Sequence, residues 1–390
     1  MDQTHGLSGL RVGAGQIVRS AFAECGDPAA IDRLAQALGP EDLALVIVFL
    51  APESDTAHLI AQAKQRFAPT PVVGCTTAGE ISARGYAEGE IVAIGLPRSH
   101  FLTRLVVIPD LDRFDGPDLI AQMIRGRNAM AGIEPDWKSE FTFLLIDGLS
   151  TREDALTAEL AMGLGPVPLF GGSAGDGETF GATWVLHDGQ ALANAAVLVQ
   201  VRSACPIKVF NTDHLTPTEA RMVVTSADPR RRIVHEINAE PAAAEFARLV
   251  GKDPAQLDTF TFAAHPVVVR IGDNHHVRAI QRVDENGDLV FFSAIDEGVV
   301  LTLAESENMV THLSRELQRL SQDGPPDTIL GCDCLLRRVE AQQTQTLGAL
   351  SRLLSDHRVV GFSTYGEQVN TMHVNHTLTG VAIYPPEPQD

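Results

Sequence analysis

A serine between glycines is the first group in the sequence that could carry out a reaction. Ser173 lies in the run GGSAG over residues 171–175, which satisfies the G-x-S-x-G pattern of esterase nucleophiles. In an esterase this serine sits on a sharp turn between a strand and a helix, and the helix supports the oxyanion site. The residues that follow, DGETFGATWV, are rich in glycine and show no helical period. A serine hydrolase that uses Ser173 is therefore the less favoured interpretation, and we expect a protein that is not an enzyme.

The same small and hydroxyl residues recur in three similar loops, VVGCTTAGE from Val72, FGGSAGD from Phe170 and VVGFSTYGE from Val359. Consecutive small residues let backbone N–H groups point into a concavity and bind an anionic group, so we predict that the loops bind a ligand. A tight connection between two strands is the alternative that the residues leave open. The acidic residues that close the loops are expected to accept turn hydrogen bonds. The predicted ligand-loop residues are Gly74, Thr76, Thr77, Gly79, Glu80, Gly171, Gly172, Ser173, Gly175, Asp176, Ser363, Thr364, Tyr365, Gly366 and Glu367.

Two histidines lie where an imidazole could serve as a ligand, because histidine is the commonest metal ligand among side chains. His214 lies in TDHLTP at the end of a predicted strand, and His265 precedes Pro266 where a turn enters an apolar strand. Each could equally be a structural histidine at a strand end. The sequence has no C-x-x-C-H motif, so any haem would be held non-covalently.

No metal-ion site is predicted from the other candidate ligands. His373 and His376 are three residues apart in an extended stretch, so we expect their side chains on opposite faces, where they cannot hold one ion together. Cys332 and Cys334 form a C-x-C pair, but no second pair completes a zinc site. Packing is the simpler explanation for both cysteines.

The loops must be positioned by a unit that occurs three times. Each copy has a buried-strand run, a helical stretch, a short strand, the loop and another strand, which indicates duplicated strand-helix-strand units. After each of the first two copies another strand follows, and we expect it to extend the sheet as a meander. The strand runs begin at Leu43, Phe141 and Thr328, and the helices are predicted over 56–67, 153–164 and 341–354.

Different material separates the second and third copies. Turn signals between short strands predict an antiparallel segment within residues 229–320. The sequence therefore predicts a mixed α/β fold of two domains, 30–228 and 229–385, with sheets built from duplicated units and an inserted antiparallel segment.

Composition excludes several classes of partner. The formal charge is −20, which repels phosphate backbones and anionic lipid, so we expect no nucleic acid and no membrane surface as partner. The one dense basic cluster, Arg230 to Arg232, follows Asp228 and Pro229 and predicts a solvated turn. The longest apolar run, Leu43 to Ala51, is less than half of the ~20 residues that span a bilayer. No secretory signal is visible, and five cysteines do not suggest a disulfide framework, so we expect a cytoplasmic protein.

Five separated motifs carry a family resemblance over about residues 30 to 384. VVGCTTAGEIS, LFGGSAGDG, FNTDHLTPT, the segment from HPVVVRIGDN to AIDEGVVL, and VVGFSTYGEQ with HVNHTLTG resemble an N-terminal FIST domain followed by a FIST C-terminal domain. The resemblance implies a bacterial sensor that binds a small ligand and acts with a histidine kinase or a cyclic-dinucleotide signalling protein. A subset of such proteins senses nitric oxide with haem, which implies haem b on His265 or His214. An amino acid or related metabolite is the competing ligand, and a scaffold without ligand is a third possibility.

Overall fold

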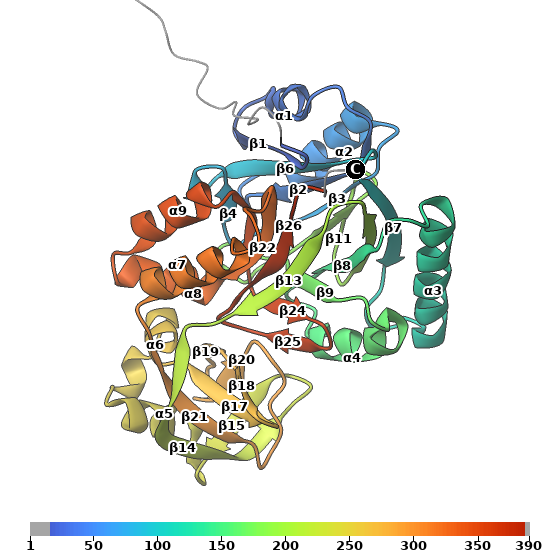
Figure 1. The fold of residues 1–390 in the computed structure, drawn as a ribbon. Coiled ribbons are helices and arrows are strands. Elements are labelled where there is room, and N and C mark those ends of the chain that lie inside the picture. Colours follow the sequence, from blue (N-terminus) through green and yellow to red (C-terminus); the bar gives the residue numbers. More distant parts are fainter. Residues whose placement is uncertain (1–15, 387–390) are drawn as a thin grey trace, which may run out of the picture.

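The computed structural model describes residues 16–386, in which three six-stranded sheets pack around a common core (Figure 1). The first sheet has the order β1 (Arg19–Glu24), β6 (Glu90–Pro97), β2 (Leu43–Leu50), β3 (Val72–Thr76), β10 (Val185–His187) and β11 (Gln190–Leu192). The second has the order β7 (Phe101–Ile108), β12 (Ala196–Ser203), β8 (Ser139–Ile146), β9 (Leu169–Ser173), β24 (Glu367–Val369) and β25 (Met372–Val374). The third has the order β13 (Ile207–Thr212), β26 (Leu378–Ile383), β22 (Thr328–Cys334), β23 (Val359–Thr364), β4 (Glu80–Ser82) and β5 (Gly85–Ala87). The mixed α/β prediction is confirmed.

Each repeated unit lends a hairpin to the sheet of another unit. The β4–β5 hairpin of the first unit pairs with β23 of the third, β10–β11 of the second pairs with β3 of the first, and β24–β25 of the third pairs with β9 of the second. The strands that follow the first two units also join the sheet of the next unit: β7 pairs with β12 of the second unit, and β13 pairs with β26 of the third. The prediction of a simple meander is therefore wrong. The edge of β6 that β7 would need is already occupied by β1.

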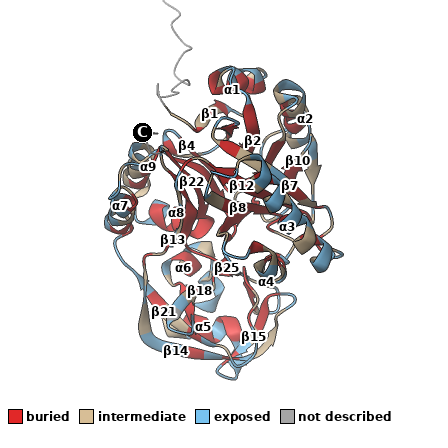
Figure 2. Ribbon diagram, turned by 45° about the vertical axis from the view of Figure 1, so that its right-hand side comes forward, coloured by how far each residue is buried: buried red, intermediate tan, exposed pale blue. Residues whose placement is uncertain are grey.

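Apolar strands build the centre of this three-sheet body. The run LALVIVFL forms β2, all of whose residues are buried, as expected for a strand covered on both faces. The inner faces of the three sheets meet in one cluster, in which the rings of Phe49 and Phe362 stack with centroids 4.5 Å apart. Phe143 and Phe170 stack in the same cluster at 4.9 Å. Figure 2 shows that the strands are buried while the surrounding helices expose their outer sides.

Two or more helices cover the outer face of each sheet. α1 (Ala30–Leu38) and α2 (Thr56–Phe67) cover the first sheet, α3 (Gly116–Ile133) and α4 (Glu153–Leu164) the second, and α7 (Met309–Leu320), α8 (Leu335–Gln343) and α9 (Leu347–Asp356) lie on the third. The helix α2 begins after Asp55, whose carboxylate accepts a hydrogen bond from the backbone N–H of His58 at 3.1 Å. The helix predicted over 341–354 is interrupted, because Thr344 to Thr346 separate α8 from α9 and Gln345 has a φ of +56°.

Residues 215–306 form a separate lobe below the three-sheet body in Figure 1. Its strands form one antiparallel sheet, which confirms the predicted antiparallel segment. The lobe contains β14 (Leu215–Asp228), β15 (Ile233–Ile237), β16 (Glu240–Pro241), α5 (Ala242–Val250), a short 3-10 helix (Pro254–Gln256), α6 (Thr259–Ala264), β17 (Val267–Ile271), β18 (Asn274–Val277), β19 (Ile280–Val283), β20 (Leu289–Phe291) and β21 (Val300–Ser306).

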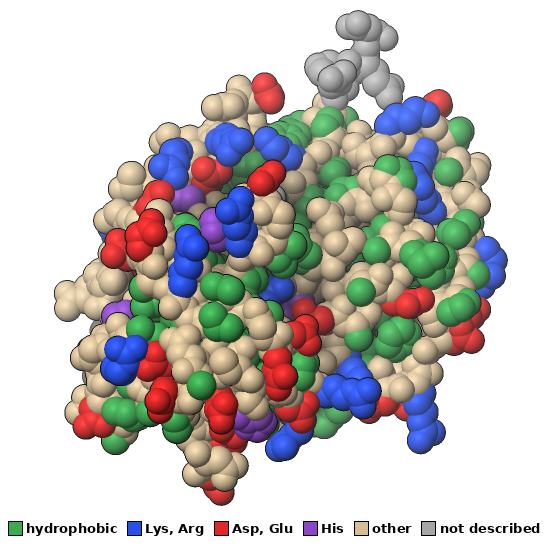
Figure 3. Space-filling view, turned by 90° about the horizontal axis from the view of Figure 1, so that it is seen from below, with side chains coloured by type: hydrophobic (Ala, Val, Ile, Leu, Met, Phe, Trp, Pro, Cys, Tyr) green, Lys and Arg blue, Asp and Glu red, His purple; other side chains and the backbone are tan. Residues whose placement is uncertain are grey.

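One buried ion pair joins the lobe to the body. Arg232 is 4% exposed and its Nη2 lies 2.5 Å from Oε2 of Glu153, which is 1% exposed. The prediction that Arg232 belongs to a solvated turn is therefore wrong, while Arg231 and Arg230 stay exposed. On the face seen from below, acidic and basic side chains are interspersed (Figure 3). Among residues 16–386 no helix is long and apolar enough to cross a membrane.

Candidate functional site

The three predicted loops meet where the parallel strands of all three sheets end. The N–H of Ala78 donates to the carbonyl of Ser363 at 2.8 Å, and the N–H of Gly175 donates to the carbonyl of Thr76 at 3.0 Å. The N–H of Ser173 donates to the carbonyl of Gly366 at 2.9 Å. The structure thus brings the loops together, and these amides bind neighbouring loops rather than facing an open cavity.

The first glycine of each loop sits where two strands approach closely. A Cβ atom on Gly74 would lie 1.8 Å from the carbonyl oxygen of Val48, and one on Gly361 would lie 1.8 Å from that of Gly331. A Cβ on Gly171 would lie 2.3 Å from the carbonyl oxygen of Leu144. The repeated glycine therefore has a packing reason that is independent of any ligand.

Of the acidic residues that close the loops, Asp176 accepts local turn hydrogen bonds, whereas Glu80 and Glu367 accept from backbone N–H groups ten residues along the chain. Glu80 accepts from the N–H of Glu90 at 3.2 Å, and Glu367 accepts from the N–H of Thr377 at 3.1 Å. Asp176 accepts three backbone N–H groups between residues 180 and 182, and Tyr365 donates its hydroxyl to the same carboxylate.

The hydroxyl and glycine residues of the loops are buried within the same junction. Oγ1 of Thr364 donates to the carbonyl of Ser173 at 2.7 Å, and Oγ1 of Thr76 accepts from the N–H of Trp184 at 3.0 Å. The hydroxyl of Thr77 donates to Glu80. A Cβ on Gly172 would lie 2.7 Å from the ring of Phe362, and Gly175 packs as closely on Ala78.

Ser173 lacks the environment of a catalytic nucleophile. Its side chain is 0% exposed, and its Oγ lies 3.3 Å from Oε1 of Glu153 and 2.9 Å from Nε2 of Gln368. The next regular element after β9 is a strand, β10, so the helix of an esterase elbow is missing. The nearby His373 bonds Gln368 and a carbonyl of the lobe instead of the serine. Among residues 16–386, no imidazole is hydrogen-bonded to Ser173 to take its proton.

A cavity of about 270 Å³ opens beside the loop junction, between the first loop and α8. We call it the α8 pocket. It is lined by Pro52, Glu53, Ala78, Gly79, Glu80, Glu88, Gly89, Gly177, Glu178, Leu335, Arg338, Val339 and Gln342. Glu80 and Arg338 are buried at its floor, while Glu53, Glu88 and Glu178 are exposed at its rim. The α8 pocket thus has one cationic group on the floor, an acidic rim and an apolar wall from α8.

The floor of the α8 pocket holds two charged groups in unusual settings. Burial raises the pKa of Glu80 to about 7, although hydrogen bonds from Thr77 and Glu90 favour its charged form. Arg338 is 4% exposed, and its Nη1 donates to the carbonyl of Ala78 at 3.2 Å. Its Nη2 lies 2.6 Å from Glu88, whose side chain is 74% exposed, and its buried Nε has no hydrogen-bond partner. The guanidinium can therefore exchange an exposed partner for an anionic ligand at little cost.

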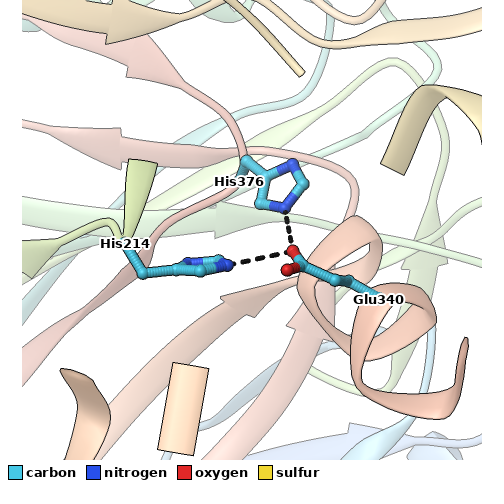
Figure 4. Close-up of side chains that lie close together, drawn as sticks. All are labelled: His214, Glu340 and His376. Atoms are coloured by element: carbon cyan, nitrogen blue, oxygen red, sulfur yellow. Dashed lines mark hydrogen bonds and ion pairs between the residues drawn. The ribbon is translucent and has the colours of Figure 1, made fainter. Parts of the chain in front are cut away.

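A second cluster lies on the other side of α8. Glu340 of α8 is hydrogen-bonded to two histidines (Figure 4). His214 lies in the link between β13 and β14, and His376 lies in the link between β25 and β26. Each Nε2 lies 2.9 Å from Oε2 of Glu340, and all three residues are buried. The ligand atoms lie within 4.8 Å of one another, which is close enough to hold a metal ion.

The atoms around this cluster do not fit a metal ion. Nη1 of Arg337 lies 2.9 Å from Nδ1 of His214, and because arginine only donates, Nδ1 must accept. The proton of His214 is then on Nε2 and points at Glu340, so this nitrogen has no lone pair for a metal. Metal-bound histidines donate from their other ring nitrogen, yet Nδ1 of His376 is buried without a partner. The cluster is a hydrogen-bonded latch in which His214 and His376 both donate to one carboxylate.

The sequence pointed to His214 but not to this latch. His214 and Glu340 are 126 residues apart in the sequence, so no local spacing could reveal the cluster. His373 and His376 do enter different networks, as their spacing predicted, since His373 bonds Gln368 and His376 bonds Glu340.

The histidines predicted to bind haem do not provide an axial site. His214 is 1% exposed and both of its ring nitrogens are engaged by charged groups, which leaves neither an apolar slot nor a free nitrogen. The half-buried ring of His265 forms no hydrogen bond with any described residue, so its second nitrogen lacks the partner that axial histidines have. The α8 pocket has no histidine in its lining. Neither the two predicted histidines nor the lining of the α8 pocket therefore fits haem.

Two family models match the chain. The FIST N domain model matches residues 44–240, and the FIST C domain model matches residues 242–370. No curated protein is significantly similar to the sequence.

Proposed function

Since the two matches span well over half of its length, the chain belongs to the FIST family of sensory signalling domains, and from this premise we propose that it senses a small zwitterionic metabolite in the α8 pocket. An amino acid is the simplest molecule of this class. Its carboxylate would replace Glu88 on Arg338, and its ammonium would lie among the rim carboxylates.

The observation that carries this proposal is the setting of Arg338. A buried guanidinium with an unpaired Nε and an easily displaced exposed partner is suited to bind a carboxylate through two parallel hydrogen bonds. The α8 pocket also lies beyond the carboxyl ends of parallel strands, which is where open α/β sheets bind ligands. Leu335 and Val339 offer an apolar wall for the remainder of the ligand.

Thermal unfolding with a panel of amino acids and small amines tests the proposal. A ligand present at 100 times its Kd should stabilise the folded chain by about 2.7 kcal/mol, which raises the Tm. This stabilisation should disappear in Arg338→Met and persist in Arg315→Met, a matched change of an exposed arginine on α7. A panel in which nothing raises the Tm, or a rise that survives Arg338→Met, would contradict the proposal.

The resemblance to FIST proteins also leads us to propose that the protein acts in the cytoplasm on a histidine kinase or a cyclic-dinucleotide signalling protein. The family membership alone supports this part. Autophosphorylation of a co-purifying kinase should change when the protein is added with its ligand, and an unchanged rate with every such kinase would exclude this class of partner.

Haem is the competing ligand. Purified protein with added haemin should stay without a Soret band if the metabolite proposal is correct. A Soret band that is lost in His265→Ala but kept in His214→Ala would instead establish haem and replace the metabolite.

A further inference from the structure

The helix α8 presents two different faces to two different parts of the molecule. Leu335, Arg338, Val339 and Gln342 line the α8 pocket, at the spacing that places residues on one side of a helix. Arg337 and Glu340 instead hold His214. If α8 moves together with Arg338, the side chains that form the latch must move as well, because both sets belong to one rigid helix.

The latch sits at the hinge of the lobe. The chain leaves the body after β13 and returns before α7, and these two segments run side by side, with Leu215 paired to Ser306. The N–H of Glu307 in the returning segment donates to the carbonyl of His214 in the leaving segment at 2.7 Å. One residue, His214, thus links both hinge segments to α8, because its carbonyl accepts from the returning segment and its side chain bonds Glu340.

The lobe also rests on α8 directly. α6 packs against α8, and Ala263 of α6 belongs to one apolar cluster with Leu335, Leu336 and Val339. Two of these residues, Leu335 and Val339, line the α8 pocket as well. The lobe, the hinge and the pocket therefore share one helix.

We propose that α8 transmits the occupancy of the α8 pocket to the lobe by tightening or releasing the His214 latch. The inference rests on the proposed ligand site and adds how its state would be passed on. A ligand can shift the latch only by binding its two states with different affinity, and Arg338 supplies that difference because it must leave Glu88 to bind an anion.

Protonation of His214 does not control the latch near pH 7. Burial, with the neighbouring Arg337 and His376, lowers the pKa of His214 to about 4, even though Glu340 counteracts the shift. The His214 ring therefore stays neutral near pH 7. A change in the state of the latch must therefore come from the elements packed against it.

Two glycines of the pocket wall allow a test without a ligand. A Cβ on Gly79 would lie 1.4 Å from Nη1 of Arg338 and would push it, whereas a Cβ on Gly89 meets nothing within 4 Å. Both glycines have positive φ, +130° and +72°, so alanine strains the backbone at either position. Hydrogen exchange of the full chain should show the hinge amide of Glu307 exchanging about fivefold faster or more in Gly79→Ala, a typical size of coupling between sites, but not in Gly89→Ala.

Equal hinge exchange in the two glycine variants would overturn the proposal, as would a change confined to the first loop. If circular dichroism shows that Gly79→Ala does not fold, the decision passes to Glu88→Gln, which releases Arg338, with Glu178→Gln as control at the same rim. Unchanged hinge exchange in Glu88→Gln then refutes the coupling. Since no ligand is used, a failed metabolite panel and a failed coupling are separate results.

Discussion

Acidification should weaken the folded chain through His214. The pKa of this imidazole is about 4 in the folded chain, mainly because it is buried, against 6.5 as its ordinary value. As the pH falls, the unfolded chain therefore takes up this proton first, so the stabilisation is complete above pH 6.5 and is lost as the pH approaches 4. Each pKa unit corresponds to about 1.4 kcal/mol, so about 3 kcal/mol is at stake and about 2 kcal/mol of it disappears between pH 7 and pH 5.

Urea unfolding of wild type and His214→Gln at about pH 7 and pH 5 isolates this contribution. Glutamine keeps a donor for Glu340 but does not titrate, so the variant should lose about 2 kcal/mol less than wild type on acidification, whatever its own stability. Groups that face the ring, namely Arg337, His376 and Glu340, are present in both proteins. His58→Gln, a change of an exposed histidine on α2, should behave as wild type. An identical pH dependence of wild type and His214→Gln would refute the reasoning.

Three further outcomes follow from the packing. Gly74→Ala should lower the stability of the folded chain by about 1–3 kcal/mol or more, because the new Cβ meets the backbone of Val48. Gly26→Ala should not lower it, because the space around Gly26 is open, and thermal unfolding compares the two variants. Glu153→Gln should cost about 3–5 kcal/mol in urea unfolding, because the buried charge of Arg232 loses its nearest carboxylate and keeps only the more exposed one of Asp154 at 3.5 Å. A loss below about 1 kcal/mol would show that the pair is not desolvated. A maleimide should label one of the five cysteines of the native chain, the half-buried Cys25, since the other four are buried; labelling that persists in Cys25→Ser would contradict the burial.

Repetition in the sequence was enough to predict the units and their loops. The apolar run of β2 and the helical periods of α2 and α4 have the bounds that their patterns indicate, because strands buried on both faces and amphipathic helices leave strong local signals. The antiparallel lobe was likewise visible through its turn residues.

The partners of short strands could not be predicted. The three-residue strands β4 and β5 carry no signal for which sheet edge they join. Their hairpin joins β23 through β4, although β23 follows it by more than 270 residues. The glycine of each loop also has two local explanations, ligand binding and close strand approach, and only the distance from Gly74 to Val48 distinguishes them. The latch could not be predicted because His214, Glu340 and His376 belong to separate segments of the sequence and lie together only in the folded structure.

The exchanged hairpins make the three units mutually dependent. The two family models meet near residue 241, yet β23 lies on one side of that point and its sheet partner β4 lies on the other. Severing the polypeptide there would leave β9 without β24 and β13 without β26, so both fragments would carry unsatisfied sheet edges. The three units are linked in a cycle, because each one completes a sheet of another. No unit is therefore expected to fold alone, and separately produced fragments should fold only when they associate.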